Sequence, residues 1–213
     1  MIAVIAGATG LVGHEVLKRL LADDSIESVI SVGRSSTKID SAKLKEVLVK
    51  DFTGLRAVEE TLAGELYFCC LGTTIKKAGS QENFRKIDHD AIIQFGTVAK
   101  KNSARSFVLV SASGANSKSN FFYNRVKGDT ERDLSEMDLK SLTVFRPGLL
   151  MGSRSEFRAG EKIAIGLGTV FAALAPARVS RSVLTYVDRL AEHMVATGKI
   201  AKPGLTVIEA NEI

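Results

Sequence analysis

The sequence contains few of the residues that build metal centres or covalent cross-links, with two cysteines and three histidines in 213 residues. The cysteines, Cys69 and Cys70, are neighbours inside an apolar run, which predicts a buried strand in a reducing compartment rather than a disulfide. The histidines His14, His89 and His193 are scattered, without the close spacing of metal ligands. We therefore expect no metal site.

The chain also lacks a long hydrophobic run, and we expect no secretory leader. It begins with a strand-like segment instead of a basic region followed by a hydrophobic stretch, so we expect a cytoplasmic protein. The longest apolar region, residues 163–177, contains Gly166, Gly168 and Pro176 and is shorter than the ~20 residues needed to span a bilayer. We expect no membrane span, and predict a packed helix, a lid over a substrate or an oligomer contact.

No dense block of charge of one sign is present. The net charge is +5 and the isoelectric point is about 9.2, but Lys and Arg residues are spread along the chain from Lys18 to Lys202. Nucleic-acid binding usually requires basic residues clustered on one face or along one element. We therefore expect no nucleic-acid partner, while a basic surface of this kind suits a protein that binds a phosphate-rich small molecule.

Apolar segments typical of buried strands alternate with segments of helical periodicity. The strand-like segments are residues 2–6, 28–32, 47–49, 66–71, 107–110, 142–145 and 205–208. This alternation predicts an α/β fold with a doubly wound parallel sheet. A chain of 213 residues with 45% hydrophobic content also suits a single domain, 1–213.

The first strand-like segment runs directly into three glycines and then into a helix-like segment, about residues 11–21. A tight turn requires a residue without a β-carbon at Gly7, close approach of a pyrophosphate requires one at Gly10, and packing of helix against strand requires one at Gly13. The first N–H groups of the helix would face the phosphates. The spacing predicts a dinucleotide-binding turn with the candidate contact residues Gly7, Thr9, Gly10, Leu11 and Gly13.

Tyr123 and Lys127 are four residues apart in a helix-like segment, which places both side chains on one face. A nearby ammonium favours the phenolate, so we expect Lys127 to lower the pKa of Tyr123 from its ordinary ~10 towards the working range. Tyr123 is therefore a candidate general acid or base on a carbonyl or alcohol. Ser111 and Ser113, which follow the fifth strand-like segment, could hydrogen-bond the substrate oxygen.

Several motifs, in the same order, resemble the short-chain dehydrogenase/reductase superfamily. They are the glycine motif at residues 7–13, Cys-Leu-Gly-Thr-Thr at 70–74, Ser-Asn-Phe at 119–121 with Tyr123, Val-Lys-Gly at 126–128 and Val-Phe-Arg-Pro-Gly at 144–148. The chain is most similar to the atypical, NmrA-like branch of the superfamily, and within it to the Tat-interactive-protein oxidoreductase family. The resemblance covers nearly the whole chain.

This resemblance implies a Rossmann-type, NADP-binding fold with a Ser-Tyr-Lys catalytic set. The set would be Ser111, Tyr123 and Lys127, with Ser113 as a rival to Ser111, and Lys127 would also bond the nicotinamide ribose. Cofactor contacts are implied after the fourth and sixth strands, at Leu71, Gly72, Thr73, Pro147 and Gly148. The superfamily often adds an asparagine from the helix after the fourth strand, and the matching position here is Asp88.

The position that distinguishes NAD from NADP carries no acid. An NAD site usually has Asp or Glu about 20 residues past the glycines, where its carboxylate bonds the ribose 2′-OH. Here residues 32–38 offer Arg34, whose planar donors suit a 2′-phosphate, with Ser35 beside it. Asp51 and Phe52 resemble the pair that flanks adenine in the superfamily, although Asp51 could instead cap a helix. We expect NADP, with NAD as the weaker alternative.

These observations together predict an NADP-dependent reductase or dehydrogenase acting on a small carbonyl or alcohol, as a monomer or homodimer. Residues 149–180 would form a lid on the substrate side or an interface segment. A nucleotide-sugar epimerase or dehydratase is an alternative enzyme, although the part of the chain after residue 148 is short for a nucleotide-sugar subdomain. A non-catalytic NADP(H)-binding redox sensor or regulatory protein is the second alternative.

Overall fold

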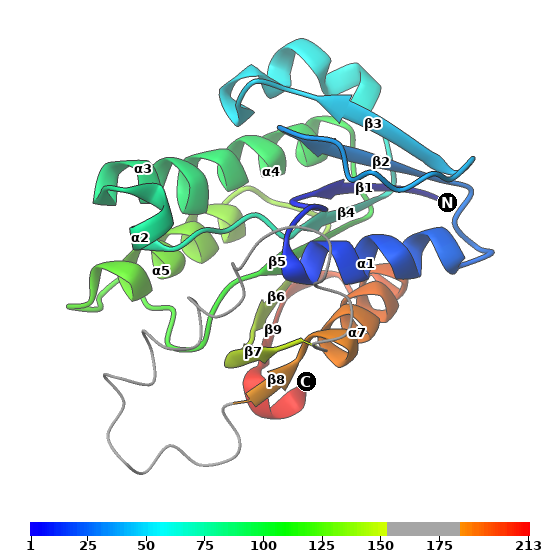
Figure 1. Cartoon of the computed structure of the whole chain (residues 1–213). Helices are drawn as coiled ribbons and strands as arrows, with labels where there is room; N and C mark the ends of the chain where they lie inside the picture. Colours follow the sequence, from blue (N-terminus) through cyan, green and yellow to red (C-terminus); the bar gives the residue numbers. More distant parts are fainter. Residues whose placement is uncertain (153–183) are drawn as a thin grey trace.

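The computed structural model describes residues 1–152 and 184–213, which form a parallel β-sheet covered by helices on both faces (Figure 1). The sheet has seven strands in the order β3-β2-β1-β4-β5-β6-β9, and every neighbouring pair is parallel. The strands are β1 (Ile2–Ala6), β2 (Ser28–Gly33), β3 (Leu44–Leu48), β4 (Leu66–Cys69), β5 (Ser106–Val110), β6 (Ser141–Arg146) and β9 (Gly204–Glu209). The strand order reverses direction between β1 and β4, and open α/β sheets bind their ligands beyond the carboxyl ends of the strands at such a reversal.

Each face of the sheet is covered by a different set of helices. One face is covered by α1 (Leu11–Ala22) and α7 (Val187–Ile200), and the other by η1 (Phe52–Leu62), α4 (Ala91–Lys101) and α5 (Phe122–Ser135). The remaining elements are short: α2 (Ile75–Ala78), α3 (Gln81–Arg85), the π-helical turn η2 (Lys86–Asp90), the paired strands β7 (Leu149–Met151) and β8 (Leu184–Tyr186), and η4 (Ala210–Glu212).

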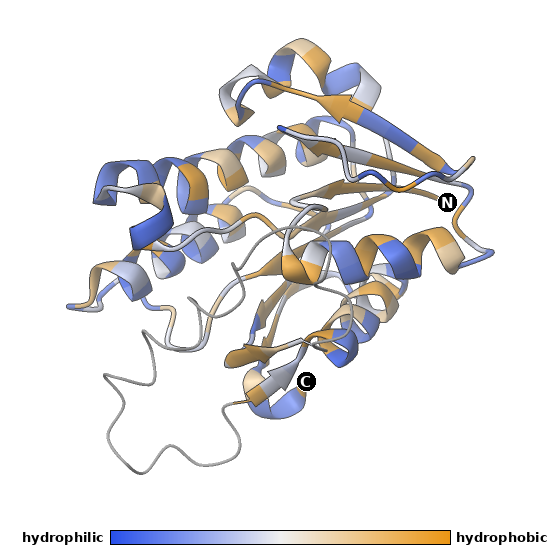
Figure 2. Cartoon of the chain, viewed as in Figure 1, coloured by the Kyte–Doolittle hydropathy of each residue, from blue (hydrophilic) through white to orange (hydrophobic). Residues whose placement is uncertain are grey.

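The central strands are apolar on both faces, as strands of a parallel sheet must be when helices cover both sides. In β1, for example, Ile5 belongs to the buried cluster that contains Leu17 of α1, while Val4 belongs to the cluster on the other face, which contains Phe95 of α4. Figure 2 shows these strands as a band of hydrophobic residues through the middle of the molecule, with the hydrophilic faces of the helices turned outwards. The sequence periodicity of strands and helices therefore accounts for both halves of the core.

The predicted fold class is confirmed, and each predicted strand is present within a few residues of its expected position. The largest shift is in β3, predicted at 47–49 and observed at Leu44–Leu48, because this edge strand has neighbours on one side only and its side chains are mostly exposed or half-buried. The strands β7 and β8 were not predicted. Of the predicted lid or interface segment 149–180, residues 153–180 lie outside the described residues, as does the apolar region 163–177. No helix within the described ranges is long and apolar enough to cross a membrane.

The variant Gly13→Ala tests whether the close approach of α1 to the turn after β1 requires a residue without a β-carbon. A β-carbon at Gly13 would lie 2.1 Å from the carbonyl oxygen of Gly7, a backbone atom that cannot rotate away. We expect Gly13→Ala to lower the free energy of unfolding, measured by urea denaturation, by about 1–3 kcal/mol. Gly54→Ala is the matched control, because nothing lies within 4 Å of its β-carbon position. Equal stabilities for the two variants would contradict this account of the turn.

Candidate active site

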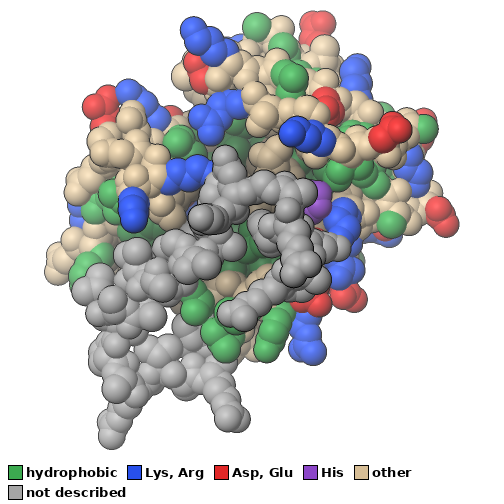
Figure 3. All heavy atoms as spheres, viewed as in Figure 1, with side chains coloured by type: hydrophobic (Ala, Val, Ile, Leu, Met, Phe, Trp, Pro, Cys, Tyr) green, Lys and Arg blue, Asp and Glu red, His purple; other side chains and the backbone are tan. Residues whose placement is uncertain are grey.

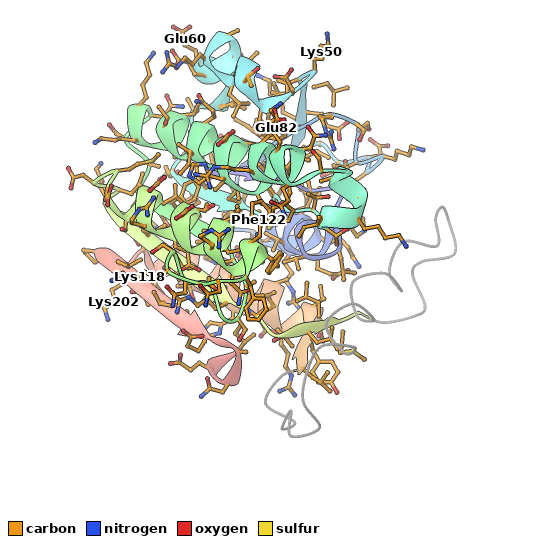
Figure 4. All side chains as sticks on the ribbon, turned by 90° about the vertical axis from the view of Figure 1, so that its left-hand side faces the viewer. Lys50, Glu60, Glu82, Lys118, Phe122 and Lys202 are labelled. Atoms are coloured by element: carbon orange, nitrogen blue, oxygen red, sulfur yellow. The ribbon has the colours of Figure 1, made fainter. Side chains whose placement is uncertain are left out.

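The residues predicted to bind cofactor or to transfer protons all follow the carboxyl ends of strands. In Figure 4 the chain is seen from the side on which these strands end, with Phe122 at the start of α5 near the middle of the view and Lys118 towards the margin. The predicted residues lie after β1 (Gly7, Thr9, Gly10, Leu11, Gly13), β2 (Arg34, Ser35), β3 (Asp51, Phe52), β4 (Leu71, Gly72, Thr73), β5 (Ser111, Ser113) and β6 (Pro147, Gly148), and on α5 (Tyr123, Lys127).

The turn after β1 has no room for side chains at two of its glycines. Gly7 has a φ of +85°, and a β-carbon there would lie 2.5 Å from the carbonyl oxygen of Cys70. A β-carbon at Gly13 would lie 2.1 Å from the carbonyl oxygen of Gly7. Gly10 differs, because its β-carbon position approaches only the Gly7 carbonyl oxygen, at 3.3 Å, and is otherwise open among the described residues. Gly7 and Gly13 thus shape the turn, and Gly10 leaves its outer surface bare for a ligand.

The N-terminus of α1 is suited to an anion. Gly10 is the N-cap residue and gives no side-chain cap, and the first turn of the helix contains no acidic residue. The first N–H groups of a helix have no partner within the helix, and the helix dipole adds positive potential there. Thr9 and Gly10 are exposed at this point. These features fit a pyrophosphate, as the sequence predicted.

The loop after β2 presents a basic side chain and is held by an acid that the sequence analysis did not single out. Arg34 is exposed and forms no ion pair with any described residue. A few residues further on, the Glu46 carboxylate of β3 accepts hydrogen bonds from the Thr37 backbone N–H at 2.6 Å and from the Thr37 hydroxyl at 2.8 Å. These bonds, the backbone N–H first, lower the pKa of Glu46 and anchor the loop.

Asp51 caps a helix. Its carboxylate accepts the Thr53 backbone N–H at 2.9 Å and the Thr53 hydroxyl at 2.5 Å, at the N-terminus of η1. The hydroxyl bond, followed by the N–H bond, lowers the pKa of Asp51. The capping alternative is thus present in the structure, and a contact of Asp51 or Phe52 with adenine stays a prediction.

Tyr123 and Lys127 lie on the inner side of α5, and Lys127 has a buried partner. Its Nζ lies 2.8 Å from Oδ1 of Asp88, whose side chain is fully buried. The other oxygen of Asp88 accepts the backbone N–H of Thr73 at 2.8 Å. A β-carbon at Gly72 would lie 3.5 Å from Asp88 Oδ1 and 3.8 Å from Lys127 Nζ. The loop after β4, the turn η2 and helix α5 therefore meet at one point.

The pKa of Tyr123 is raised in this structure, whereas the sequence predicted that it would be lowered. Burial of the phenol raises its pKa above the ordinary value, Lys127 acts in the opposite direction, and Asp88 raises it further. The ring also packs on Phe84, with 5.5 Å between centroids. For Lys127, burial alone would disfavour the charged form, but attraction to Asp88 and Tyr123 outweighs it and raises the pKa of the ammonium. The expectation of a lowered tyrosine pKa considered Lys127 without Asp88.

The two candidate serines have different surroundings. Ser111 is buried, and its hydroxyl donates a hydrogen bond to the Glu131 carboxylate of α5. Glu131 is paired in turn with Arg146, with 2.6 Å between Nη2 and Oε2. Ser113 is exposed, and its backbone N–H donates to the Pro147 carbonyl at 2.9 Å. Its hydroxyl forms no hydrogen bond with a described residue.

Arg146 connects α5 to the sheet, a role that the sequence analysis did not assign. Besides Glu131 it pairs with Glu209 of β9 at 2.8 Å. The hydrogen bond with Glu131 is the main cause of the raised pKa of Arg146. Helix α5 is also packed closely against the loop that precedes it, because a β-carbon at Gly128 would lie 2.1 Å from the backbone N of Ser117. A polar residue on the helical face that also carries Tyr123 and Lys127 was the available signal for Glu131.

A glycine turn at a helix N-terminus, beside the reversal of strand order in a parallel sheet, defines the class of Rossmann-fold dinucleotide-binding proteins. A family model described as NAD(P)H-binding matches residues 7–187, and the chain belongs to this family. Among its relatives, "Protein HTATIP2" of Rattus norvegicus is 36% identical over 163 residues, which cover 75% of this chain and 67% of the relative. "Protein FMP52, mitochondrial" of Candida albicans is 35% identical over 173 residues, covering 79% and 76%. The predicted resemblance is confirmed.

Solved structures with the same fold are more distant in sequence. The structure titled "MoeE5 in complex with UDP-glucose and NAD" has a TM-score of 0.73 at 14% identity and covers 98% of this chain and 75% of that one. The Bordetella bronchiseptica enzyme WbmH in complex with NAD+ has a TM-score of 0.71 at 17% identity and covers 96% and 74%. At such identities the likeness shows the fold alone. The family and the fold together support an NAD(P)-binding protein of the oxidoreductase and epimerase type.

The relatives contradict the expected cytoplasmic location. FMP52 proteins of several fungi, including Candida albicans, Scheffersomyces stipitis and Eremothecium gossypii, are named mitochondrial. The expectation depended on the missing pattern of a secretory leader, which does not distinguish the cytoplasm from an organelle that proteins enter by another route.

The Arg146 network yields a stability prediction. Arg146→Met removes the cation and leaves the buried Glu131 carboxylate unpaired, so we expect a loss of about 3–5 kcal/mol in the free energy of unfolding. The double variant Arg146→Met/Glu131→Leu should regain part of this loss, because it removes the stranded charge. Arg132→Ala, on the solvent side of α5, should cost less than about 1 kcal/mol. Denaturant unfolding of the variants measures each difference, and equal losses for Arg146→Met and Arg132→Ala would contradict the role given to Arg146.

Proposed function

We propose that this chain is an NADP(H)-dependent oxidoreductase that acts on a small carbonyl compound or alcohol, with Tyr123 as the proton donor or acceptor. The observation that carries the proposal is the meeting of Lys127 and Asp88 with Gly72 of the loop after β4, with Tyr123 one helical turn before Lys127. The glycine turn lies at the same edge of the sheet, after the carboxyl end of β1. A hydride-transfer enzyme requires a side chain that transfers a proton and a site for the dinucleotide close to each other.

The residues after β1 and β2 fit a dinucleotide. The bare surface at Gly10 and the N-terminus of α1 would hold the pyrophosphate, and Arg34 with Ser35 would hold the adenosine 2′-phosphate. Gly72 and Thr73 would line the path towards the nicotinamide, and Lys127 would bond its ribose. A reduced nicotinamide bound there supplies the hydride that a carbonyl carbon accepts.

Side chains of the protein would then transfer the proton to or from the substrate oxygen. The Tyr123 hydroxyl would donate it to the substrate oxygen in reduction, or accept it in alcohol oxidation, and the Lys127 ammonium would stabilise the phenolate form. A serine hydroxyl would bond the substrate oxygen as negative charge develops on it. We now favour Ser113 for this role, because the Ser111 hydroxyl is engaged by Glu131. The turn that contains Ser113 adjoins α5, since a β-carbon at Gly114 would lie 3.1 Å from Asn124 Nδ2.

Cofactor choice depends on Arg34 in this proposal. Arg34→Ala should weaken NADPH binding by about 1.5–3 kcal/mol through loss of charged hydrogen bonds, and should leave NADH binding unchanged. Lys202→Ala, which removes a charge before β9 at the margin of the view in Figure 4, is the control for net charge. Fluorescence titration of the parent and the variants with both cofactors measures these affinities. Equal affinity of the parent for NADH and NADPH would refute the preference.

The catalytic assignment predicts a large effect of Tyr123→Phe. General acid–base catalysis contributes ~10²–10⁴-fold, so the variant should lose at least a hundredfold in kcat/KM for reduction of an aldehyde, ketone or quinone, while NADPH affinity stays within a factor of about two. Tyr186→Phe, on the exposed side of β8, is the matched control and should keep the parent rate.

Two further outcomes decide the remaining alternatives. Ser113→Ala should slow turnover more than Ser111→Ala, and the reverse order would return the catalytic role to Ser111. A parent that binds NADPH but reduces nothing across a broad panel of carbonyls would favour the redox-sensor alternative over an enzyme.

A further inference from the structure

The last strand of the sheet, β9, has no strand at its outer edge among the described residues. In Figure 4 it lies at the margin of the molecule, near Lys202. Edge strands are usually protected by charged side chains, because their free N–H and C=O groups can pair with another chain. Here the segment 203–208, Pro-Gly-Leu-Thr-Val-Ile, carries no charge. This edge therefore lacks the charged side chains that usually prevent pairing.

The hydrogen bonds to the chain at β6 show which groups of β9 face outwards. The Gly204 N–H donates to the Lys140 carbonyl at 3.0 Å, so the backbone groups of Gly204 point towards β6. Along a strand this direction alternates from one residue to the next, and the register with β6 is unbroken from residue 204 to residue 209. The N–H and C=O groups of Leu205 and Val207 therefore point to the free edge.

The free part of this edge is bounded on both sides. Pro203, which precedes it, has no N–H group. The Glu209 N–H, which follows it, donates to Oε2 of Glu212 in the same chain at 2.9 Å. Leu205 and Val207 are thus the two residues of β9 whose outward N–H groups can still donate to another strand.

The side chains of the same two residues are exposed. Leu205 is 55% exposed and Val207 is 36% exposed, and both lie on the face of the strand that is turned towards α5. They line a groove of about 420 Å³ together with Val144 of β6 and Gly128 of α5. Helix α5 therefore leaves this margin of the sheet uncovered, and apolar side chains lie there beside free backbone groups.

We propose that β9 pairs in antiparallel orientation with β9 of a second copy of this chain, which joins the two sheets across a twofold axis. In this register Leu205 lies opposite the partner subunit's Val207, and the axis passes between the two copies of Thr206. Each opposed pair exchanges two hydrogen bonds, so every free N–H of both strands finds an acceptor. A shift by two residues would place Leu205 opposite the partner subunit's Glu209, whose N–H is already engaged.

This self-complementarity is the reason for choosing a second copy as the occupant. A twofold interface requires that residue i contact residue j while j contacts i, and β9 meets this requirement through its own two residues. The two opposed pairs also place Leu205 beside the partner subunit's Val207 on the groove side. Such cross-strand apolar pairs stabilise an antiparallel sheet.

Val207→Lys tests the interface, because it places a charge at each of two symmetric positions without altering the backbone. Sedimentation equilibrium of the parent chain should show a dimer, and the variant should raise its dissociation constant by about tenfold or more. Leu48→Lys is the matched control, since Leu48 is 58% exposed on β3, the edge strand at the other end of the sheet. It should leave the dissociation constant unchanged. A monomeric parent, or a dimer that Val207→Lys leaves intact, would overturn the proposal.

A disulfide tests the register independently. Opposed residues of a non-hydrogen-bonded antiparallel pair have Cα atoms about 4.5 Å apart, which is within the range that a disulfide spans. Thr206→Cys should therefore give a covalent dimer under mild oxidation, seen by non-reducing gel electrophoresis. The parent, which has free Cys69 and Cys70, and the variant Leu48→Cys are the controls and should stay monomeric on the gel. Equal cross-linking of Thr206→Cys and Leu48→Cys, or no cross-linking of Thr206→Cys, would overturn the proposal.

Discussion

Helix α5 carries two buried charged residues, and each is paired with a residue of another element. Lys127 pairs with Asp88, and one turn later Glu131 pairs with Arg146. Breaking one such pair strands the other partner in a medium of low dielectric, which costs far more than the intact pair contributes. The position of the helix, and hence of Tyr123, therefore depends on both pairs being complete. Figure 3 shows a different pattern on the surface, where Lys and Arg side chains are interspersed with acidic ones over the visible described residues.

The two halves of the candidate site are built by different physical means. On the cofactor side, the shape comes from missing side chains: Gly7 and Gly13 permit contacts that any β-carbon would prevent. On the catalytic side, a charged residue holds the elements together. Asp88 joins the loop after β4 to α5 through a hydrogen bond and an ion pair. A glycine defect should thus disturb packing first, whereas a charge defect should disturb the protonation of the site as well.

Similarity to known proteins identifies the fold and the family of this chain, but not the reaction that it catalyses. The structure of MoeE5 in complex with UDP-glucose and NAD shares the fold at 14% identity, while the relatives near 35% identity define the family. Because one fold carries many functions, the shared architecture cannot choose between an epimerase and a reductase. The proposed choice rests on this chain's own residues: Arg34 in the loop after β2, which has no ion-pair partner among the described residues, and Tyr123, which lies one helical turn from the buried Lys127–Asp88 pair.

The sequence by itself determined the parts of this protein that arise from local regularity. Alternating apolar segments predicted the strands, and the spacing of Gly7, Gly10 and Gly13 predicted the turn at α1, because strand burial and backbone geometry act over a few neighbouring residues. The four-residue spacing likewise placed Tyr123 and Lys127 on one helical face.

The protonation of Tyr123 was decided only by the tertiary structure. The expected downward shift of its pKa became an upward one, because folding buries the phenol and brings Asp88, far away in the chain, to the lysine. The tertiary structure also decided the partner of Ser111, because folding brings Glu131 of α5 to the residue that follows β5. Electrostatic effects depend on distance in space and on burial, and neither is set by separation along the chain.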